Sequence, residues 1–131
     1  EIVKVSGSSQ YFQGGIVSYA NEIKIDFVGV NKEDLERDGA VSETVVKQMA
    51  LNGKKQLGVA YCISTSGIAG PDGGTEEKPV GLVWIGIAGP EGVNAKSFLF
   101  GDFRERNIRM TVLSALNLLR CKLLEINTEK K

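Results

Sequence analysis

A glycine-rich stretch, residues 65–81, lies between two apolar runs and limits how this chain can fold. The apolar runs, at 59–63 and 80–88, have the length and composition of buried strands. A connection that only reversed the chain direction would need a few residues. This one is longer and has four glycines within eight positions, at 67, 70, 73 and 74. We therefore expect a long glycine-rich loop at one end of a sheet.

Two interpretations fit this loop. Glycines permit positive φ angles and a close approach of backbone N–H groups, and an array of such groups forms a concavity that suits a phosphate. The alternative is a long polar loop whose glycines only make turns. The stretch is not a P-loop, because no Gly-Lys-Ser/Thr sequence follows it. It also differs from the dinucleotide-binding pattern, because a predicted strand follows instead of a helix.

The amino-acid composition argues against several classes of function. The 131 residues, 42% of them hydrophobic, suffice for one globular domain with a real core. Sixteen basic and sixteen acidic residues cancel, which argues against a nucleic-acid partner. No apolar run approaches the roughly 20 residues of a membrane span. Cys62 and Cys121 lie in apolar stretches without motif spacing, which indicates buried free thiols in a reducing cytoplasm.

The chain contains no histidine. This excludes a Ser-His-Asp or Cys-His system within the chain and removes the commonest zinc ligand, so we expect no metal. Any general base within the chain must therefore be a lysine, tyrosine, aspartate or glutamate.

The first half of the chain predicts one strand and three helical segments. Residues 16–19 form a short β-branched run that indicates a strand. Asn21, Asn31 and Ser42 each precede a helical pattern and are residues that favour helix N-caps. The pattern after Ser42 is the longest, and its apolar positions are Val45, Val46, Met49, Ala50, Gly53 and Leu57.

The second half predicts a hairpin and a long helix. Strand 80–88 is apolar on both faces, which places it inside the sheet, and the turn 89–92 leads into strand 93–100. Asp102 and Glu105 have the spacing of a capping box. The apolar stripe of the helix that follows is formed by Ile108, Val112, Leu116, Leu119 and Leu123.

Strands and helices therefore alternate, with one hairpin near the end. This order predicts a single α/β domain over residues 1–131, with three α/β/α layers around a mixed sheet. Trp84 should be mostly buried within the sheet.

Three arginines, Arg104, Arg106 and Arg109, lie in the first two turns of the last helix. Cations at a helix N-terminus oppose the helix dipole, and guanidinium groups match phosphate geometry. The cluster therefore indicates either an anion site or three arginines screened by Asp102, Glu105 and solvent.

Tyr19 and Lys24 flank the turn between the first predicted strand and helix. Alone, each is explained by packing or by surface exposure. If both reach the crevice at the sheet edge, a desolvated Lys24 would have a lowered pKa and could accept a proton from a nucleophile.

Three stretches of the chain carry specific motifs. The first is Gly7-Ser-Ser-x-Tyr-Phe-x-Gly-Gly-x-x-x-Tyr-x-Asn-x-x-Lys24, and the second is Gly39-Ala-Val-Ser-Glu43. The third is Thr65-Ser-Gly-Ile-Ala-Gly-Pro-Asp-Gly-Gly-Thr-x-x-Lys-Pro-Val-Gly81. Together these stretches closely resemble the C-terminal domain of the CinA family. The resemblance continues through Gly101-Asp102 and covers nearly the whole chain.

The resemblance implies an α/β/α domain with nicotinamide mononucleotide amidohydrolase activity in the bacterial cytoplasm, without a cofactor. The family is associated by name with competence and DNA damage, and its domain occurs alone or behind a molybdopterin-binding-like domain. Family members begin the domain with Glu-Ser-Cys-Thr-Gly-Gly, whose Ser is the proposed nucleophile. Nothing precedes Glu1 here, so the chain is expected to be truncated. Phe103 also interrupts the usual Gly-Asp-Arg sequence.

The leading hypothesis is an amidase that acts on a small nucleotide, with Lys24 as general base, Tyr19 as an orienting group and Ser from outside the chain. The alternative is a non-catalytic nucleotide-binding or protein-interaction module. Homo-oligomer formation is left open, and no membrane partner is expected. The residues expected to contact the substrate are Gly14, Gly15, Thr65, Gly67, Gly70, Gly73, Gly74, Thr75, Arg104, Arg106 and Arg109.

Overall fold

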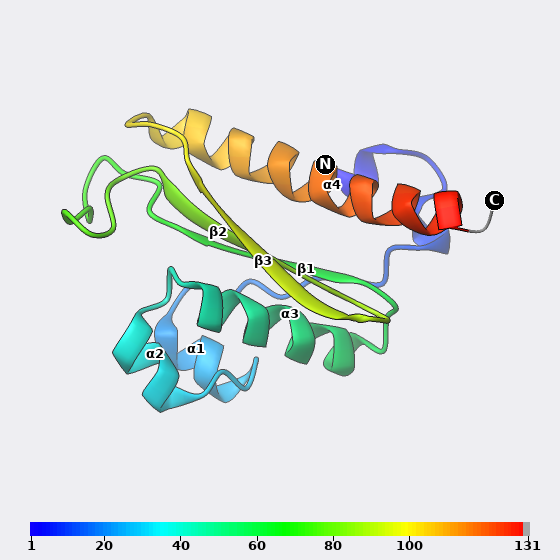
Figure 1. The fold of residues 1–131 in the computed structure, drawn as a ribbon, viewed down its shortest axis with the longest axis horizontal. Helices are drawn as coiled ribbons and strands as arrows, with labels where there is room; N and C mark the ends of the chain where they lie inside the picture. Colours follow the sequence, from blue (N-terminus) through cyan, green and yellow to red (C-terminus); the bar gives the residue numbers. More distant parts are fainter. Residues whose placement is uncertain (130–131) are drawn as a thin grey trace.

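The computed structural model describes the backbone of residues 1–129 and the side chains of residues 1–125, and it has three layers (Figure 1). A three-stranded sheet lies between helix α3 on one face and helix α4 on the other, with α1 and α2 beside α3 (Figure 1). The helices are α1 (Asn21–Asp26), α2 (Lys32–Asp38), α3 (Glu43–Leu57) and α4 (Arg104–Glu129), and the strands are β1 (Cys62–Gly67), β2 (Leu82–Gly89) and β3 (Gly92–Leu99). Two 3₁₀ turns, Ile2–Lys4 and Ser8–Gln10, precede them.

The predicted α/β/α layering is confirmed, but the predicted mixed sheet is wrong. The strand order is β1-β2-β3, and both strand pairs among the described residues are antiparallel. The sequence predicted a further strand at 16–19, and that segment has no regular secondary structure and is not part of the sheet. Val17 is 89% exposed. A β-branched composition alone therefore does not make a strand, because a strand also needs a partner with which to share hydrogen bonds.

The central position of β2 is confirmed. Ile85 is fully buried, and with Val83 and Ala115 it forms the core between the sheet and α4. Trp84 is mostly buried, as the sequence predicted, and the part that remains exposed lines a surface pocket. The hairpin is also as predicted, since Gly89 pairs directly with Gly92 across a two-residue turn.

Local capping residues set the starts of α2 and α3. The side chain of Asn31 accepts a hydrogen bond from the backbone N–H of Asp34 at 2.9 Å. Ser42 Oγ accepts one from Val45 N at 3.3 Å, so both predicted caps are confirmed. The prediction for α1 is wrong by one residue, because Asn21 is its first helical residue and Ala20 occupies the cap position.

Helix α4 packs on the sheet through a different side from the predicted stripe. Asn107 and Ala115 are 1% and 2% exposed and lie on the sheet side, whereas Ile108 and Leu123 are 50% and 42% exposed. The helix begins at Arg104, one residue later than a cap at Asp102 requires. The sequence contains two neighbouring helical stripes, and the more apolar one lies beside the sheet contact instead of in it.

Candidate functional site

The glycine-rich loop between β1 and β2 extends beyond one end of the sheet (Figure 1). Hydrogen bonds close its base, from Ile68 N to Leu82 O at 2.9 Å and from Gly81 N to Ile68 O at 2.7 Å. At its far side, Thr75 N donates to Lys78 O at 2.8 Å, and Lys78 N donates to Thr75 Oγ1 at 3.0 Å. Hydrogen bonds within the loop therefore contribute to its shape.

Two glycines show why this loop excludes larger residues. Gly70 has a φ of +87°, and an added Cβ would collide with the side chain of Val80. A Cβ on Gly74 would lie 2.7 Å from Val80 N. The chain therefore folds closely back on itself here. The other predicted contact residues of this region follow the same path, Thr65 and Gly67 at the end of β1 and Gly73 and Thr75 in the exposed part of the loop.

The start of α4 lies against the same loop, but the three arginines do not form one cluster. Arg104 Nη1 donates to Gly70 O at 2.9 Å. The guanidinium of Arg106 lies over Gly101, with Nη1 3.6 Å from the position of a Cβ there. Arg109 is near the N-terminus, where it adds a small contribution to the lowered pKa of Glu1, whose main cause is the hydrogen bond from Lys4. Arg104 thus contacts the loop directly, and Arg109 is directed elsewhere.

Lys24 is buried, with 7% of its surface exposed. Its Nζ donates to Ser18 O at 2.6 Å and to Tyr19 O at 3.3 Å. Burial lowers the pKa of the Lys24 amine, because removal from water penalises the charged form. Lys24 thus contacts Tyr19 through the backbone carbonyl of Tyr19, and the Tyr19 side chain is 81% exposed.

Gly14 and Gly15 lie away from the glycine-rich loop. A Cβ on Gly14 would be 3.9 Å from Leu57, the last residue of α3, whereas Lys78 of the loop contacts Asp38 and Gly39, which precede the first residue of that helix. Gly15 has no atom within 4 Å of such a Cβ. These two glycines and the loop are therefore not brought together among the described residues.

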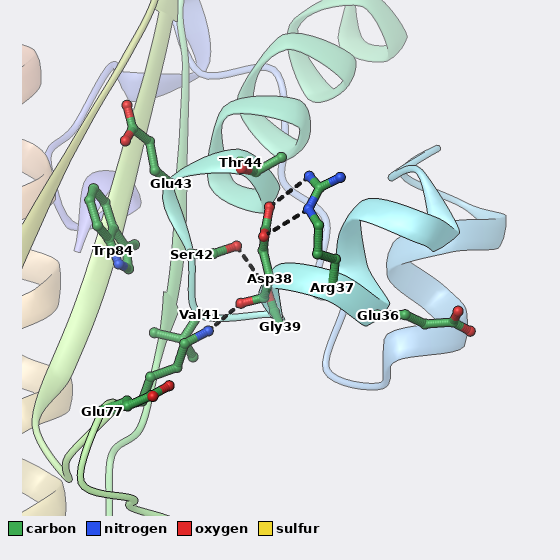
Figure 2. A pocket seen from close by; sticks show the side chains of 11 residues that line it. Glu36, Arg37, Asp38, Gly39, Val41, Ser42, Glu43, Thr44, Glu77 and Trp84 are labelled. Atoms are coloured by element: carbon green, nitrogen blue, oxygen red, sulfur yellow. Dashed lines mark hydrogen bonds and ion pairs between the residues drawn. The ribbon is translucent and has the colours of Figure 1, made fainter.

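A pocket of about 630 Å³ lies where the loop meets the corner between α2 and α3 (Figure 2). Lys78 Nζ donates to Asp38 O, the last residue of α2, and a Cβ on Gly39 would lie 2.8 Å from that amine. Figure 2 shows Trp84 on the sheet side of the pocket and Arg37 with Asp38 on the helix side. The loop is therefore attached to helices on both faces of the sheet.

An ion pair gives this pocket its strongest charge interaction. Arg37 Nη2 lies 2.9 Å from carboxylate oxygens of both Asp34 and Asp38. The hydrogen bond from Arg37, and then that from Thr44, lower the pKa of Asp38 to about 2. Sequence reasoning missed Asp38, Lys78 and Trp84 as a group, although Lys78 belongs to the glycine-rich stretch and Gly39 to another stretch of the family resemblance.

Comparisons with known proteins agree with this architecture. The family described as the CinA C-terminal domain matches residues 1–123. The chain belongs to this family. A CinA-like protein from Trichormus variabilis is 49% identical over 94% of the chain, and one from Gloeothece citriformis is 51% identical over 94%. The chain spans 30% of the length of each of these relatives.

Solved structures show the same fold. The competence/damage inducible protein CihA from Agrobacterium tumefaciens superposes with a TM-score of 0.88 at 36% identity, covering 91% of this chain and 73% of that one. The competence damage-inducible protein A from Klebsiella pneumoniae superposes with a TM-score of 0.89 at 28% identity, covering 94% and 76%. Within the described residues, no helix is long and apolar enough to cross a membrane, and no group of three or more His, Cys, Asp or Glu side chains could hold a metal ion.

Proposed function

We propose that this domain hydrolyses the carboxamide of nicotinamide mononucleotide to nicotinate mononucleotide and ammonia in the cytoplasm. The observation that carries the proposal is Lys24, a buried amine with a lowered pKa at the start of α1. A lysine in this state reaches its neutral form at a lower pH than a solvated lysine, and only the neutral amine can accept a proton.

The nucleophile in this proposal is a serine carried by a segment outside residues 1–131. Its Oγ attacks the carboxamide carbon while Lys24 Nζ takes the hydroxyl proton, and a tetrahedral oxyanion forms. When this intermediate collapses, the C–N bond breaks, the Lys24 ammonium returns the proton to the leaving nitrogen, and ammonia departs. Water then attacks the acyl-enzyme by the same route and releases the carboxylate. Backbone N–H groups of the glycine-rich loop are the proposed donors to the oxyanion.

Helix α4 offers a place for such a segment. An apolar stripe on α4 lies beside the sheet contact and includes exposed side chains. It consists of Ile108, Val112, Leu116, Leu119 and Leu123. The N-terminus lies next to α4 (Figure 1), close enough for Arg109 to affect the pKa of Glu1. A helix that leads into Glu1 could cover this stripe and run beside α4, whose first turn contacts the loop.

The substrate phosphate is assigned to the loop and to Arg106. Arg104 is already used in its hydrogen bond with Gly70 O, whereas Arg106 is an exposed cation over Gly101. The exposed Tyr19 side chain is free to contact the pyridine ring or the ribose.

A non-catalytic binding module is the second candidate. The observation in its favour is that Lys24 Nζ already donates to two backbone carbonyls, which is also the contact pattern of a structural lysine. Ammonia release from nicotinamide mononucleotide separates the two candidates. The polypeptide that carries the preceding serine should release ammonia, while its Ser→Ala variant and residues 1–131 alone should bind the nucleotide without turnover. Binding without ammonia release by the serine-containing polypeptide would favour the binding module.

A further inference from the structure

Asn107 is a polar residue in an apolar position. It is 1% exposed on the sheet side of α4, in line with Ala115 and Leu118, which pack in the core against Val83 and Ile85. Burying an amide is unfavourable unless hydrogen bonds to protein replace those to water. An apolar residue would fill the space without that penalty, so the polar group needs an explanation.

The amide nitrogen of Asn107 joins two loops. Its Nδ2 donates to Ala69 O at 2.9 Å, in the glycine-rich loop, and to Gly101 O at 2.8 Å, between β3 and α4. Its Oδ1 is buried and accepts no hydrogen bond among the described residues. The two carbonyls determine which end of the amide is the nitrogen, because the reverse orientation would place oxygen against oxygen. The amide nitrogen therefore makes both loop contacts, and the amide oxygen has no hydrogen-bond partner among the described residues.

Neighbouring contacts also hold these two loops together. Arg104, one turn earlier on α4, donates to Gly70 O, so two successive loop carbonyls are held by the same helix. Phe100 N donates to Gly81 O at 3.0 Å, and a Cβ on Gly81 would collide with the Gly101 backbone. The segments 68–70, 81 and 100–101 are thus packed around the Asn107 side chain.

We infer that Asn107 is a positioning residue of the proposed amidase site. It holds the backbone at Ala69 and Gly70, and it thereby sets the direction of the N–H groups in the loop that follows. The effect of Asn107 on catalysis rests on the proposed function. The effect of Asn107 on the loop conformation does not, because it is a property of the folded chain. Its unsatisfied Oδ1 fits this role, because the side chain is placed for the loop contact at some expense to stability.

Hydrogen exchange tests the positioning without any substrate. In Asn107→Leu, the amides of Ile68, Thr75 and Gly81 should exchange roughly tenfold faster, about the effect of losing one net hydrogen bond. Exchange in α3 should stay unchanged. Thr111→Val is the matched control, because Thr111 is the next residue on this side and, among the described residues, its Oγ1 donates its hydrogen bond to the backbone carbonyl of Asn107 within the helix. Unchanged loop exchange in a folded Asn107→Leu protein would overturn the inference.

A second variant covers a failure of Asn107→Leu to fold. Asn107→Asp keeps the shape but loses the NH₂ donor, so it should also speed up exchange in the loop. Slow exchange in this variant at neutral pH would equally contradict the inference.

Kinetics tests the consequence for the site. In the serine-containing polypeptide, Asn107→Leu should lower kcat/KM for nicotinamide mononucleotide by roughly tenfold, because the same loop supplies the proposed phosphate contacts and the proposed oxyanion donors. The pH profile of the rate should stay unchanged, because Lys24 is unaltered in this variant. An unchanged kcat/KM in a folded Asn107→Leu protein, or a shifted pH profile, would contradict the assignment. If the unsubstituted protein releases no ammonia, the proposed function fails, while the exchange result still decides the role of Asn107.

Discussion

Replacing Lys24 by methionine removes the buried amine and keeps most of the aliphatic side chain. If Lys24 is the general base, kcat for ammonia release should fall by roughly 10²–10⁴-fold, the usual contribution of a positioned base. Lys24→Arg should not restore the rate, because a guanidinium stays protonated at working pH. The hydrogen bonds to Ser18 O and Tyr19 O would be lost as well. Their loss should lower the free energy of unfolding by about 1–2 kcal/mol, partly offset because no cation is then buried.

The pH dependence gives this prediction its sharpest test. The folded protein holds Lys24 with a pKa below the usual 10.5, so the unfolded chain binds more protons between the two values. The burial penalty is therefore fully present below the folded pKa and disappears as pH rises toward 10.5, which makes stability rise with pH in this window. Activity should rise through the folded pKa, because the neutral amine is the active form. Lys24→Met should remove both dependences.

The assay is ammonia release from nicotinamide mononucleotide across a pH series, with chemical unfolding measured at the same pH values. Lys55→Met is the matched control, since Lys55 is an exposed lysine in the last turn of α3. It should leave the rate and its pH profile unchanged. Near-normal ammonia release by Lys24→Met would refute the serine–lysine mechanism, and Tyr19 would then be the next candidate base.

Three further predictions concern binding and stability. Arg106→Glu should weaken binding of nicotinamide mononucleotide more than Arg109→Glu does, and titration calorimetry that gave the opposite order would contradict this. Both variants should have free energies of unfolding within about 0.5 kcal/mol of that of the unsubstituted protein. Ser42→Ala should lower the free energy of unfolding by about 1 kcal/mol through loss of the α3 cap, and an unchanged denaturant midpoint would contradict this. Arg37→Met should make the free energy of unfolding less dependent on pH in the acid range. The lowered pKa of Asp38 contributes stability above pH 3.8, and this contribution is lost as the pH falls toward about 2.

Features that depend on neighbouring residues could be predicted from the sequence. The caps at Asn31 and Ser42 form between residues three positions apart, so their geometry is encoded locally. The central place of β2 follows from its apolar residues on both faces.

Features that depend on tertiary partners could not be predicted. Residues 16–19 have the composition of a strand, but no neighbouring strand shares their hydrogen bonds in the described structure. The stripe from Ile108 was the more apolar of two, yet the sheet packs against the side with Asn107 and Ala115. Helical periodicity shows that a face exists, but it does not show which of two adjacent faces meets the sheet.

The same limit applies to the site. Lys78 and Asp38 are 40 residues apart, and Asn107 and Ala69 are 38 apart. Each looks like an ordinary loop or helix residue until the fold brings its carbonyl partner near. The family resemblance includes Lys78 and the Gly39 stretch, but the sequence did not show that the two meet.

The strand order β1-β2-β3 has a consequence for how the chain folds. Each strand pairs with its neighbour in sequence, and the β2–β3 turn has two residues, so that hairpin closes a short segment of chain. Short loops close quickly, whereas contacts between distant residues carry a larger entropy loss and slow folding. The contacts that attach the glycine-rich loop to α2 and α4 join residues 34 to 40 positions apart. We therefore expect the hairpin to form early and the loop to acquire its final shape late, after both helical layers have docked.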